Sequence, residues 1–452
     1  MQDEYTTDAH KAQEAAPVLL RDTSSTGKTR PWAEHHKGSQ ALAALYDYMA
    51  DPSGDGAQTS PDAARYLALS QRLMSCAPWA VFEQTPDGQR LQASSFCRVR
   101  LCPMCQWRRS LKLAGQARMV VAEADRRRSI DDHRGQGWRW MMLTLTVRNV
   151  SGDRLAQEID ALHKALKRLT LRKVWPAAGW LRATEITYNH KADTYHPHMH
   201  LLLAVPPEYF SGRAYLSKSK WVQLWRDVAK LDYDPVLDIR VVRPKPGSDG
   251  LGAALAEVAK YGAKPSDYIR PQDIDLSARV IGVLTQYLDG RRLTSWGGCL
   301  KEAAAALQLD DVETGNLIHI TDEQSDNDAA DIIHDYILYR WSVGWGDYEQ
   351  ADTWTDMPAW VRAGKARRQA AADRTVLSDA ERARAAEALS IAAAMGRKRR
   401  GDKHGQEQAL PRPQQPDSGS CAEQTSLYAM GADNGPDAPS VQGLPGTSCI
   451  RV

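Results

Sequence analysis

Residues 196–205 read HPHMHLLLAV, and this stretch decides how the rest of the chain is interpreted. On a β-strand successive side chains point to opposite faces, so His198 and His200 project from the same face, about 7 Å apart. The apolar side chains that alternate with them project from the other face, where helices would cover them. Pro197 favours a strand that is only beginning to pair at its start. Two imidazoles at this spacing can converge on one metal ion, the alternative being two strand histidines without a ligand.

A carboxylate on the preceding strand completes a candidate metal site. Residues 181–189 alternate as a strand, and Glu185 falls on what we expect to be the histidine face. Two histidines and one carboxylate offer mixed nitrogen and oxygen ligands, which suit Mg²⁺ or Mn²⁺ acting with a phosphate. His196 shares the face by parity and is the alternative third ligand. Glu185 is favoured, because three ligands from one short strand would be hard to converge.

The elements around the histidine strand predict an α+β fold built on one antiparallel sheet. Strands are expected at residues 139–147, 181–189, 197–205 and 237–243, and helices at residues 153–173, 215–230 and 250–264. This order, β-α-β-β-α-β-α, fits a ferredoxin-like sheet with helices packed on one face. Residues 270–395 are expected to be mainly helical, with a capping-box spacing at residues 378–381 and a helix stop at Gly396.

Composition suggests how the rest of the chain is divided. Residues 1–60 and 397–452 are rich in small and polar residues and are predicted to be mostly disordered tails, with a short helix near residues 41–48. Residues 61–130 form a cysteine-rich basic segment, residues 131–300 the sheet domain and residues 301–396 a helical region. No apolar run approaches the roughly 18 residues that span a membrane. The N-terminus lacks the pattern of a signal peptide, so we expect a cytoplasmic protein with no membrane partner.

Charge is unevenly distributed along the chain. The 452 residues carry a net charge of only +2, but basic residues gather at residues 98–128, 164–173 and 397–400. Each cluster alone is typical of a solvated helix face, whereas three together favour an anionic polymer as partner. The candidates for contact with such a polymer are Arg100, Arg108, Arg109 and Arg148.

Four of the 7 cysteines predict a structural zinc site. Cys97, Cys102 and Cys105 lie close together, and Cys76 lies upstream as the candidate fourth ligand. The Cys-Pro-x-Cys turn at residues 102–105 points two thiolates at one metal ion, and four thiolates make a tetrahedral zinc site. The alternative is a small core of reduced cysteines. Zinc is favoured, because these cysteines sit among arginines that could face DNA phosphates.

A tyrosine segment, EVAKYGAKPSDY at residues 257–268, follows the histidine strand. Glu257 and Tyr261 are four residues apart and would share a helix face, with Lys260 and Lys264 beside the tyrosine. A phenol has a pKa near ~10 and is a poor nucleophile at neutral pH unless it is helped. A neighbouring ammonium group favours the phenolate and can neutralise charge that grows on a reacting phosphate.

Three motifs stand in an order that resembles the plasmid rolling-circle replication initiators. LTLTVRN at residues 143–149 resembles their first motif, HPHMH at residues 196–200 their histidine motif, and residues 257–267 their tyrosine motif. The chain is thereby similar to the single-tyrosine branch of the HUH endonuclease superfamily. The resemblance covers roughly residues 95–305, including the cysteine-rich region and RRLTSWGG at residues 291–298, and covers neither tail.

This resemblance implies a site-specific single-strand endonuclease and strand transferase. The initiator would bind the plasmid double-strand origin and expose a single-stranded nick site. His198 and His200 would hold the metal, and Tyr261 would keep the 5′-phosphate as a phosphotyrosine ester. The released 3′-hydroxyl would prime a host DNA polymerase, with a host helicase as a further partner. In this branch a glutamate four residues before the tyrosine activates water to end the cycle, and Glu257 occupies that position.

Three other interpretations remain open. A zinc-containing DNA-binding protein without catalysis would have no need of Tyr261. A relaxase or transposase of the same superfamily is the second, although relaxases usually place the tyrosine ahead of the histidines and transposase domains are shorter. A metal-dependent hydrolase would need more carboxylates near the histidines than the sequence offers. The sequence leaves the origin recognised, the oligomeric state and the role of residues 301–396 open.

Overall fold

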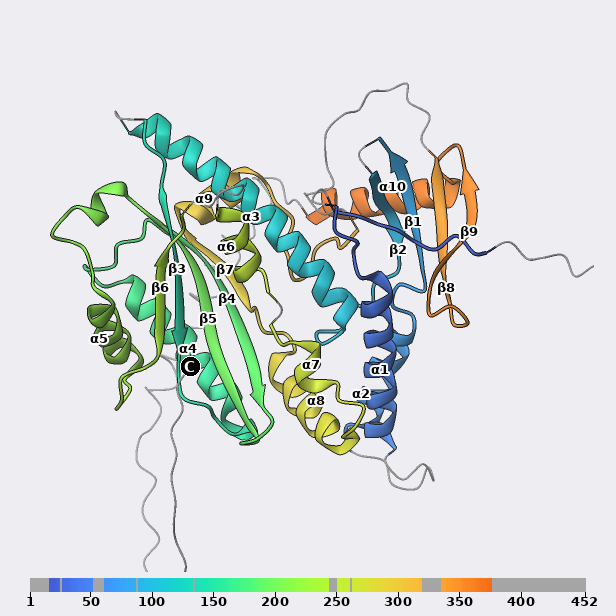
Figure 1. Cartoon of the computed structure of the whole chain (residues 1–452), viewed down its shortest axis with the longest axis horizontal. Coiled ribbons are helices and arrows are strands. Elements are labelled where there is room, and N and C mark those ends of the chain that lie inside the picture. Colours follow the sequence, from blue (N-terminus) through green and yellow to red (C-terminus); the bar gives the residue numbers. More distant parts are fainter. Residues whose placement is uncertain are drawn as a thin grey trace, which may run out of the picture. The chain divides into compact units, whose positions relative to one another are not determined.

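The structure is a computed structural model of the chain. It describes residues 16–24, 27–51, 61–86, 88–132, 135–243, 250–260, 262–318 and 335–375. The chain divides into two units, Met1–Ala372 and Asp373–Val452, and the description below concerns the first. This unit is an α+β structure with two antiparallel sheets (Figure 1).

The histidine strand lies at the centre of the larger sheet. Its five strands are β3 (Arg139–Thr146), β4 (Gly179–Asn189), β5 (Thr194–Val205), β6 (Leu237–Val241) and β7 (Thr294–Gly298). They run in the order β6-β3-β5-β4-β7, and each neighbouring pair is antiparallel. With α4 (Leu155–Thr170) after β3 and α5 (Lys218–Ala229) after β5, the predicted order β-α-β-β-α-β is confirmed. The short 3₁₀ turns η1 (Gly152–Arg154) and η2 (Pro207–Phe210) precede these two helices.

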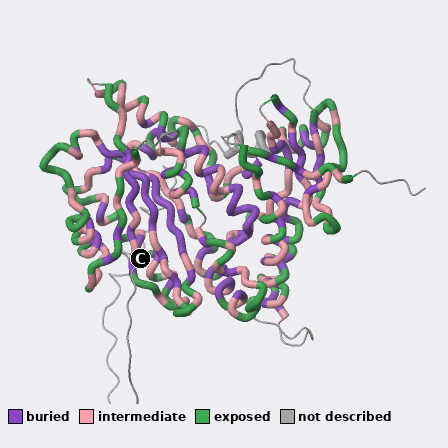
Figure 2. Tube along the Cα trace, in the orientation of Figure 1, coloured by how far each residue is buried: buried purple, intermediate pink, exposed green. Residues whose placement is uncertain are grey.

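Helices cover both faces of this sheet, so the prediction of helices on one face is wrong. Helices α4 and α5 pack on the face that carries Met199 and Leu201. The opposite face is covered by α3 (Pro103–Asp131), α6 (Leu251–Val258) and α9 (Cys299–Ala306), which pack against Met142 and Leu202. The sequence explains why both faces are covered. Strands buried on both faces have continuous apolar runs, such as LLLAV at residues 201–205, rather than alternating ones. The buried strands stand out in Figure 2.

The helix predicted at residues 250–264 ends early. Helix α6 stops at Val258, and a separate turn of helix, α7 (Pro265–Tyr268), begins after an extended Lys264. Proline disfavours the helical conformation in the residue before it, which explains why Lys264 is extended and why α7 begins separately at Pro265. Helix α8 (Ile274–Leu288) follows. Tyr261 lies outside the described residues, so the expectation that Glu257 and Tyr261 share one helix face stays a prediction.

A second sheet joins distant parts of the chain. Its strands are β1 (Trp79–Thr85), β2 (Gly88–Ser94), β8 (Tyr336–Ser342) and β9 (Asp347–Trp354), in the order β2-β1-β8-β9. Helix α10 (Ala359–Thr375) follows β9. The expectation that residues 270–395 are mainly helical is thus wrong at β7, β8 and β9. The capping box at residues 378–381 and the stop at Gly396 lie outside the described residues.

The predicted N-terminal tail contains a core helix. Helix α1 (Trp32–Ala50) packs against α2 (Ala63–Met74), α3 and α8. Trp32 and Tyr46 are buried, and the Tyr46 hydroxyl lies 2.6 Å from Thr285 Oγ1 of α8. Disorder is therefore a wrong expectation for residues 32–50, whereas residues 397–452 lie outside the described residues. Among the helices of the described residues, none has the length and apolarity to cross a membrane.

Candidate functional site

The register of the central strands brings the predicted metal ligands together. His198 lies opposite Thr146 of β3 and Glu185 of β4, and His200 lies opposite Thr144 of β3. Residues directly opposite one another in a sheet share a face, so these side chains all project from one side. The strand alternation that suggested a paired-histidine site is the feature that positions it.

Glu185, His198 and His200 form a compact cluster. Glu185 Oε2 lies 3.2 Å from His200 Nε2 and 3.5 Å from His198 Nε2. One donor atom from each of the three residues lies within 4.8 Å of the others. The Glu185 side chain is 5% exposed, and those of His198 and His200 are 12% and 10% exposed. The cluster therefore offers one carboxylate oxygen and two imidazole nitrogens in a largely dry setting.

Hydrogen bonds on the far side of each ring favour cation binding at Nε2. His198 Nδ1 lies 3.1 Å from the main-chain oxygen of His196, and a carbonyl can only accept, so Nδ1 carries a proton. In a neutral ring Nε2 then presents a lone pair to the Glu185 carboxylate, an arrangement that is favourable only with a proton or a metal ion between them. His200 Nδ1 is held 3.2 Å from the Thr144 hydroxyl. Fixing the outer nitrogen in this way is how proteins orient metal-ligating histidines.

The carboxylate of the cluster is ready to bind a cation at neutral pH. Burial raises the pKa of Glu185, but hydrogen bonds with His198 and His200, together with the charge of Lys264, hold that pKa below its usual value. Lys264 Nζ lies 3.3 Å from Glu185 Oε1, on the other carboxylate oxygen. The donor set thus fits a hard divalent cation such as Mg²⁺ or Mn²⁺, which prefers oxygen and tolerates imidazole.

His196, the alternative third ligand, lies beside His198 but outside the cluster. Its ring centroid is 5.2 Å from that of His198, and Glu185 rather than His196 completes the ligand group in the described part of the chain. Burial lowers the pKa of His196, and its Nε2 is buried without a hydrogen-bond partner. Through its main-chain oxygen His196 orients His198. Its role as a ligand stays a prediction.

Residues 262–267, in the second half of the tyrosine segment, run along the edge of β4 that β7 leaves open. Strand β7 pairs with β4 only as far as Ala183. Beyond that point the β4 amides donate to other acceptors, Ile186 to the Gly262 carbonyl at 2.8 Å and Tyr188 to the Asp267 carboxylate at 3.4 Å. Residues 262–267 therefore follow the strand that carries Glu185, which explains how Lys264 reaches that carboxylate.

The two predicted lysines take different partners. Lys264 contacts Glu185 of the candidate metal ligands, whereas Lys260 Nζ pairs with Glu257 Oε2 at 2.6 Å. Lys264 is thus the cation closer to the candidate ligands, and Lys260 with Glu257 forms a neighbouring charged pair. The side chains of Lys260 and Lys264 are 43% and 46% exposed, so both ammonium groups remain accessible to a phosphate.

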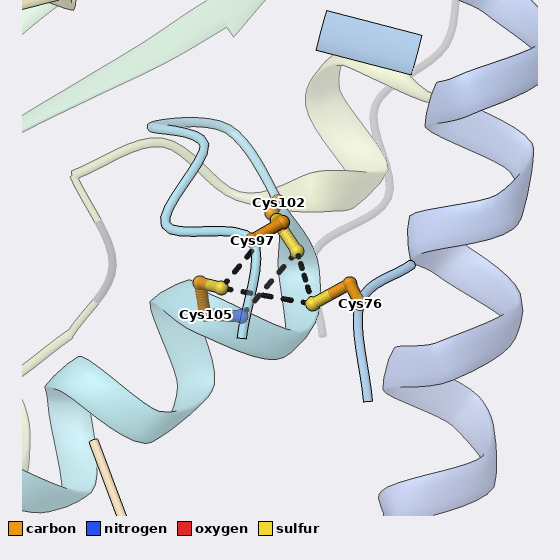
Figure 3. Close-up of side chains that lie close together, drawn as sticks. All are labelled: Cys76, Cys97, Cys102 and Cys105. Atoms are coloured by element: carbon orange, nitrogen blue, oxygen red, sulfur yellow. Dashed lines mark hydrogen bonds between the residues drawn. The ribbon is translucent and has the colours of Figure 1, made fainter. Parts of the chain in front are cut away.

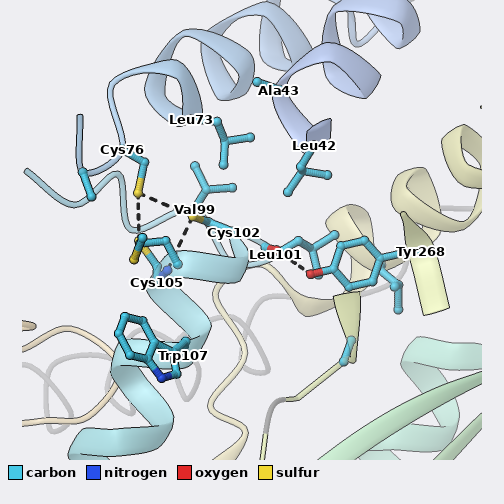
Figure 4. Close-up of a cluster of buried hydrophobic side chains, with 14 of the residues drawn as sticks. Leu42, Ala43, Leu73, Cys76, Val99, Leu101, Cys102, Cys105, Trp107 and Tyr268 are labelled. Atoms are coloured by element: carbon cyan, nitrogen blue, oxygen red, sulfur yellow. Dashed lines mark hydrogen bonds between the residues drawn. The ribbon is translucent and has the colours of Figure 1, made fainter. Parts of the chain in front are cut away.

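Tyr268, the other tyrosine of the segment, has a structural role that the sequence did not reveal. It is fully buried, its hydroxyl donates to the Leu101 carbonyl at 2.6 Å, and it accepts from Gln106 Nε2 at 2.8 Å. These bonds tie α7 to the cysteine-rich segment, as Figure 4 shows for Tyr268 and Leu101. A buried hydroxyl with both partners filled is a poor candidate for a nucleophile.

Four cysteines converge at the start of α3 (Figure 3). The Sγ of Cys76 lies 3.5 Å from that of Cys102 and 3.7 Å from that of Cys105, and Cys97 lies 3.6 Å from Cys105. Tetrahedral zinc with Zn–S bonds of about 2.3 Å holds its sulfurs about 3.8 Å apart, so the cluster has the dimensions of such a site. The Arg98 amide also donates to Cys105 Sγ at 3.2 Å. Cys76 therefore lies where a fourth ligand is needed.

The predicted DNA-contacting arginines separate into buried and exposed residues. Arg108 is fully buried and donates to the main-chain oxygens of Leu317 and Ile318, so its expected phosphate contact is wrong for this structure. Arg100 is paired with Glu313 and 18% exposed, and Arg109 donates to the Arg98 carbonyl. Arg148 is 65% exposed beyond the end of β3 and stacks on Tyr233. Of the four, Arg148 is the most exposed to solvent.

Comparisons with known protein sequences match this chain to replication proteins. A family model described as Replication protein matches residues 88–349. A "Protein rep" of Bacillus amyloliquefaciens is 35% identical over 347 residues, which cover 73% of this chain and 96% of that protein. A "Protein rep" of a Bacillus species is 38% identical over 62% of this chain and 92% of its own length, and one of Streptococcus pneumoniae serotype 2 is 36% identical over 68% and 89%. No solved structure gives a significant match.

Proposed function

Because the chain belongs to the Replication protein family, we propose that it starts and ends rolling-circle replication of a plasmid by nicking and rejoining one strand at the double-strand origin. The observation that carries this proposal is the contact between Lys264 and Glu185. It brings the tyrosine segment to a cluster of one carboxylate and two imidazoles. The split β-α-β-β-α-β topology supports a ferredoxin-like nicking domain of the HUH kind.

Each group at the site has a role in this proposal. Glu185, His198 and His200 would hold Mg²⁺ or Mn²⁺, and a cation there supplies Lewis-acid polarisation of the scissile phosphate. The Tyr261 oxygen attacks phosphorus, the bond to the 3′-oxygen breaks, and the 5′-phosphate stays on the tyrosine. Lys264 neutralises charge that grows on the phosphate. The ester conserves the phosphodiester bond energy, so rejoining needs no ATP.

The partners follow from the products of the nick. The free 3′-hydroxyl is a primer for a host DNA polymerase, and unwinding ahead of it calls for a host helicase. Exposed Arg148 would contact the DNA backbone near the open end of β3. The four-cysteine cluster would hold structural Zn²⁺ and take no part in the chemistry, because its sulfur atoms are largely buried and face one another.

A nicking assay with and without metal separates this proposal from a DNA-binding protein without catalysis. We expect the full-length protein to convert supercoiled plasmid carrying its own origin into open circles in Mn²⁺ or Mg²⁺, and not in EDTA. The nicked strand should have a 3′ end that polymerase extends and a 5′ end that resists a 5′-exonuclease even after protease treatment, because a tyrosine-containing peptide stays joined to the phosphate. Binding to the origin without any nick, in either metal, would support the binding-only alternative. A nick with a free 5′-phosphate would favour a hydrolase.

Glu257 is proposed as the general base that activates water to end the cycle. Glu257→Ala should nick at a rate within about threefold of the unmodified protein but release few single-length circles and accumulate longer products. Glu302→Ala, which removes an exposed glutamate from α9, is the matched control. The measurement is a gel of replication products from a plasmid with two tandem origins. Normal yields of single-length circles from Glu257→Ala would show that Glu257 is not the terminating general base.

A further inference from the structure

A groove of about 560 Å³ lies next to the proposed nicking site. One wall comes from α1, with Glu34 and His35, and the other from the tyrosine segment, with Lys260, Lys264 and Ser266. Its volume falls within the range of about 300–1,000 Å³ that is typical of small-ligand sites. Lys264 lines the groove and also contacts Glu185, so this one side chain links the groove to the cluster of Glu185, His198 and His200.

The lining combines positive charge with flat apolar surface. Lys260 and Lys264 provide two accessible ammonium groups on one wall, and most of the remaining lining is apolar, including Pro103 and Ile269. The His35 ring stacks on Trp107 with centroids 4.9 Å apart and an interplanar angle of 22°. Burial lowers the pKa of His35 to about 4, so the ring is uncharged at neutral pH. Cations beside an uncharged apolar surface suit a nucleotide, which carries a phosphate and a flat base.

We propose that this groove receives one unpaired base of the nicked strand, next to the scissile phosphate, with the flanking phosphates beside Lys260 and Lys264. A base can enter only when it is released from the duplex stack, so the groove would also help to hold the nick site single-stranded. The exposed carboxylate of Glu34 would accept a hydrogen bond from an exocyclic amino group. The groove then favours adenine, cytosine or guanine over thymine at that position. This inference rests on the proposed function and adds a recognition site to it.

An abasic scan tests the groove directly. Oligonucleotides that span the nick, each lacking one base, are measured by fluorescence anisotropy with the full-length protein. Loss of one particular base beside the nick should weaken binding about tenfold, the scale on which single bases contribute to single-strand binding. Ser266→Trp, which fills the groove from an exposed position, should bind the intact oligonucleotide about tenfold more weakly and show no further loss at that abasic position. Ser211→Trp places the same ring on an exposed loop outside the groove and should retain the full profile.

A second variant tests the selectivity. Placing thymine at the same position should weaken binding by the unmodified protein, and Glu34→Ala should remove most of that discrimination while leaving the abasic effect in place. The inference is overturned if Ser266→Trp keeps the unmodified abasic profile or if Glu34→Ala keeps the full discrimination against thymine. Either result with normal tyrosine–DNA adduct formation leaves the proposed function intact. Absence of any adduct from the unmodified protein would instead reject the proposed function.

Discussion

Tyr261→Phe should abolish nicking of origin DNA while leaving origin binding unchanged. The substitution removes only the phenolic oxygen, so the metal ligands and the basic surface keep their groups. Loss of a nucleophile is expected to lower the rate of nicking by at least about 10³-fold. The measurement is the initial rate of conversion of supercoiled plasmid to open circles, paired with a gel-shift affinity for the same origin.

Tyr48→Phe is the matched control for this variant. Tyr48 donates to Asp275 from the end of α1, away from the metal cluster, and its loss should leave nicking within about twofold. Tyr268→Phe is unsuitable as a control, because the Tyr268 hydroxyl is buried and holds α7 to Leu101. Nicking by purified Tyr261→Phe at the normal rate would show that another nucleophile, such as metal-activated water, does the chemistry.

The double variant Cys102→Ser, Cys105→Ser should lose its zinc and much of its stability. Structural zinc contributes about 10–16 kcal/mol in small zinc-finger peptides, and a chain with large cores of its own should lose a part of that. We expect a fall of at least about 10 °C in the midpoint of thermal unfolding. Metal analysis of the unmodified protein should find about one zinc per chain, and the double variant should have none.

Cys299→Ser provides the control for the cysteine prediction. Cys299 begins α9 and lies outside the four-cysteine group, so this variant should keep both its zinc and its unfolding temperature. Treatment of the unmodified protein with a strong chelator should reproduce the destabilisation of the double variant. Equal stability with and without metal would show that the cluster is a core of reduced thiols, which is the alternative interpretation of these cysteines.

Local patterns were sufficient to predict strands β3, β4, β5 and β6 and the cluster of candidate metal ligands. The alternation of residues in β4 and β5 places Glu185, His198 and His200 on one face, and this follows from strand geometry without knowledge of the wider fold. The hairpin between these strands fixes the register, so the three side chains meet. The preference for Glu185 over His196 also followed from geometry, and the structure places the Glu185 carboxylate against both imidazoles.

Features that depend on contacts between residues far apart in the sequence could not be predicted from local patterns. Strand β8 pairs with β1, more than 250 residues earlier in the chain, so neither strand's partner is visible from its neighbours in sequence. Helix α1 is buried by α2, α3 and α8, although its small and polar residues suggested a tail. Arg108 appeared in a basic cluster, yet its guanidinium satisfies carbonyls of residues 317 and 318, more than 200 positions away.

The most direct test of nicking through a tyrosine is to identify the residue that becomes joined to DNA. The full-length protein is incubated with a single-stranded origin oligonucleotide and Mn²⁺, and the digested adduct is sequenced by mass spectrometry. We expect a nucleotide 5′-phosphate on the peptide that contains Tyr261, with no adduct in EDTA. An adduct on any other residue, or cleavage of the oligonucleotide without an adduct, would contradict it.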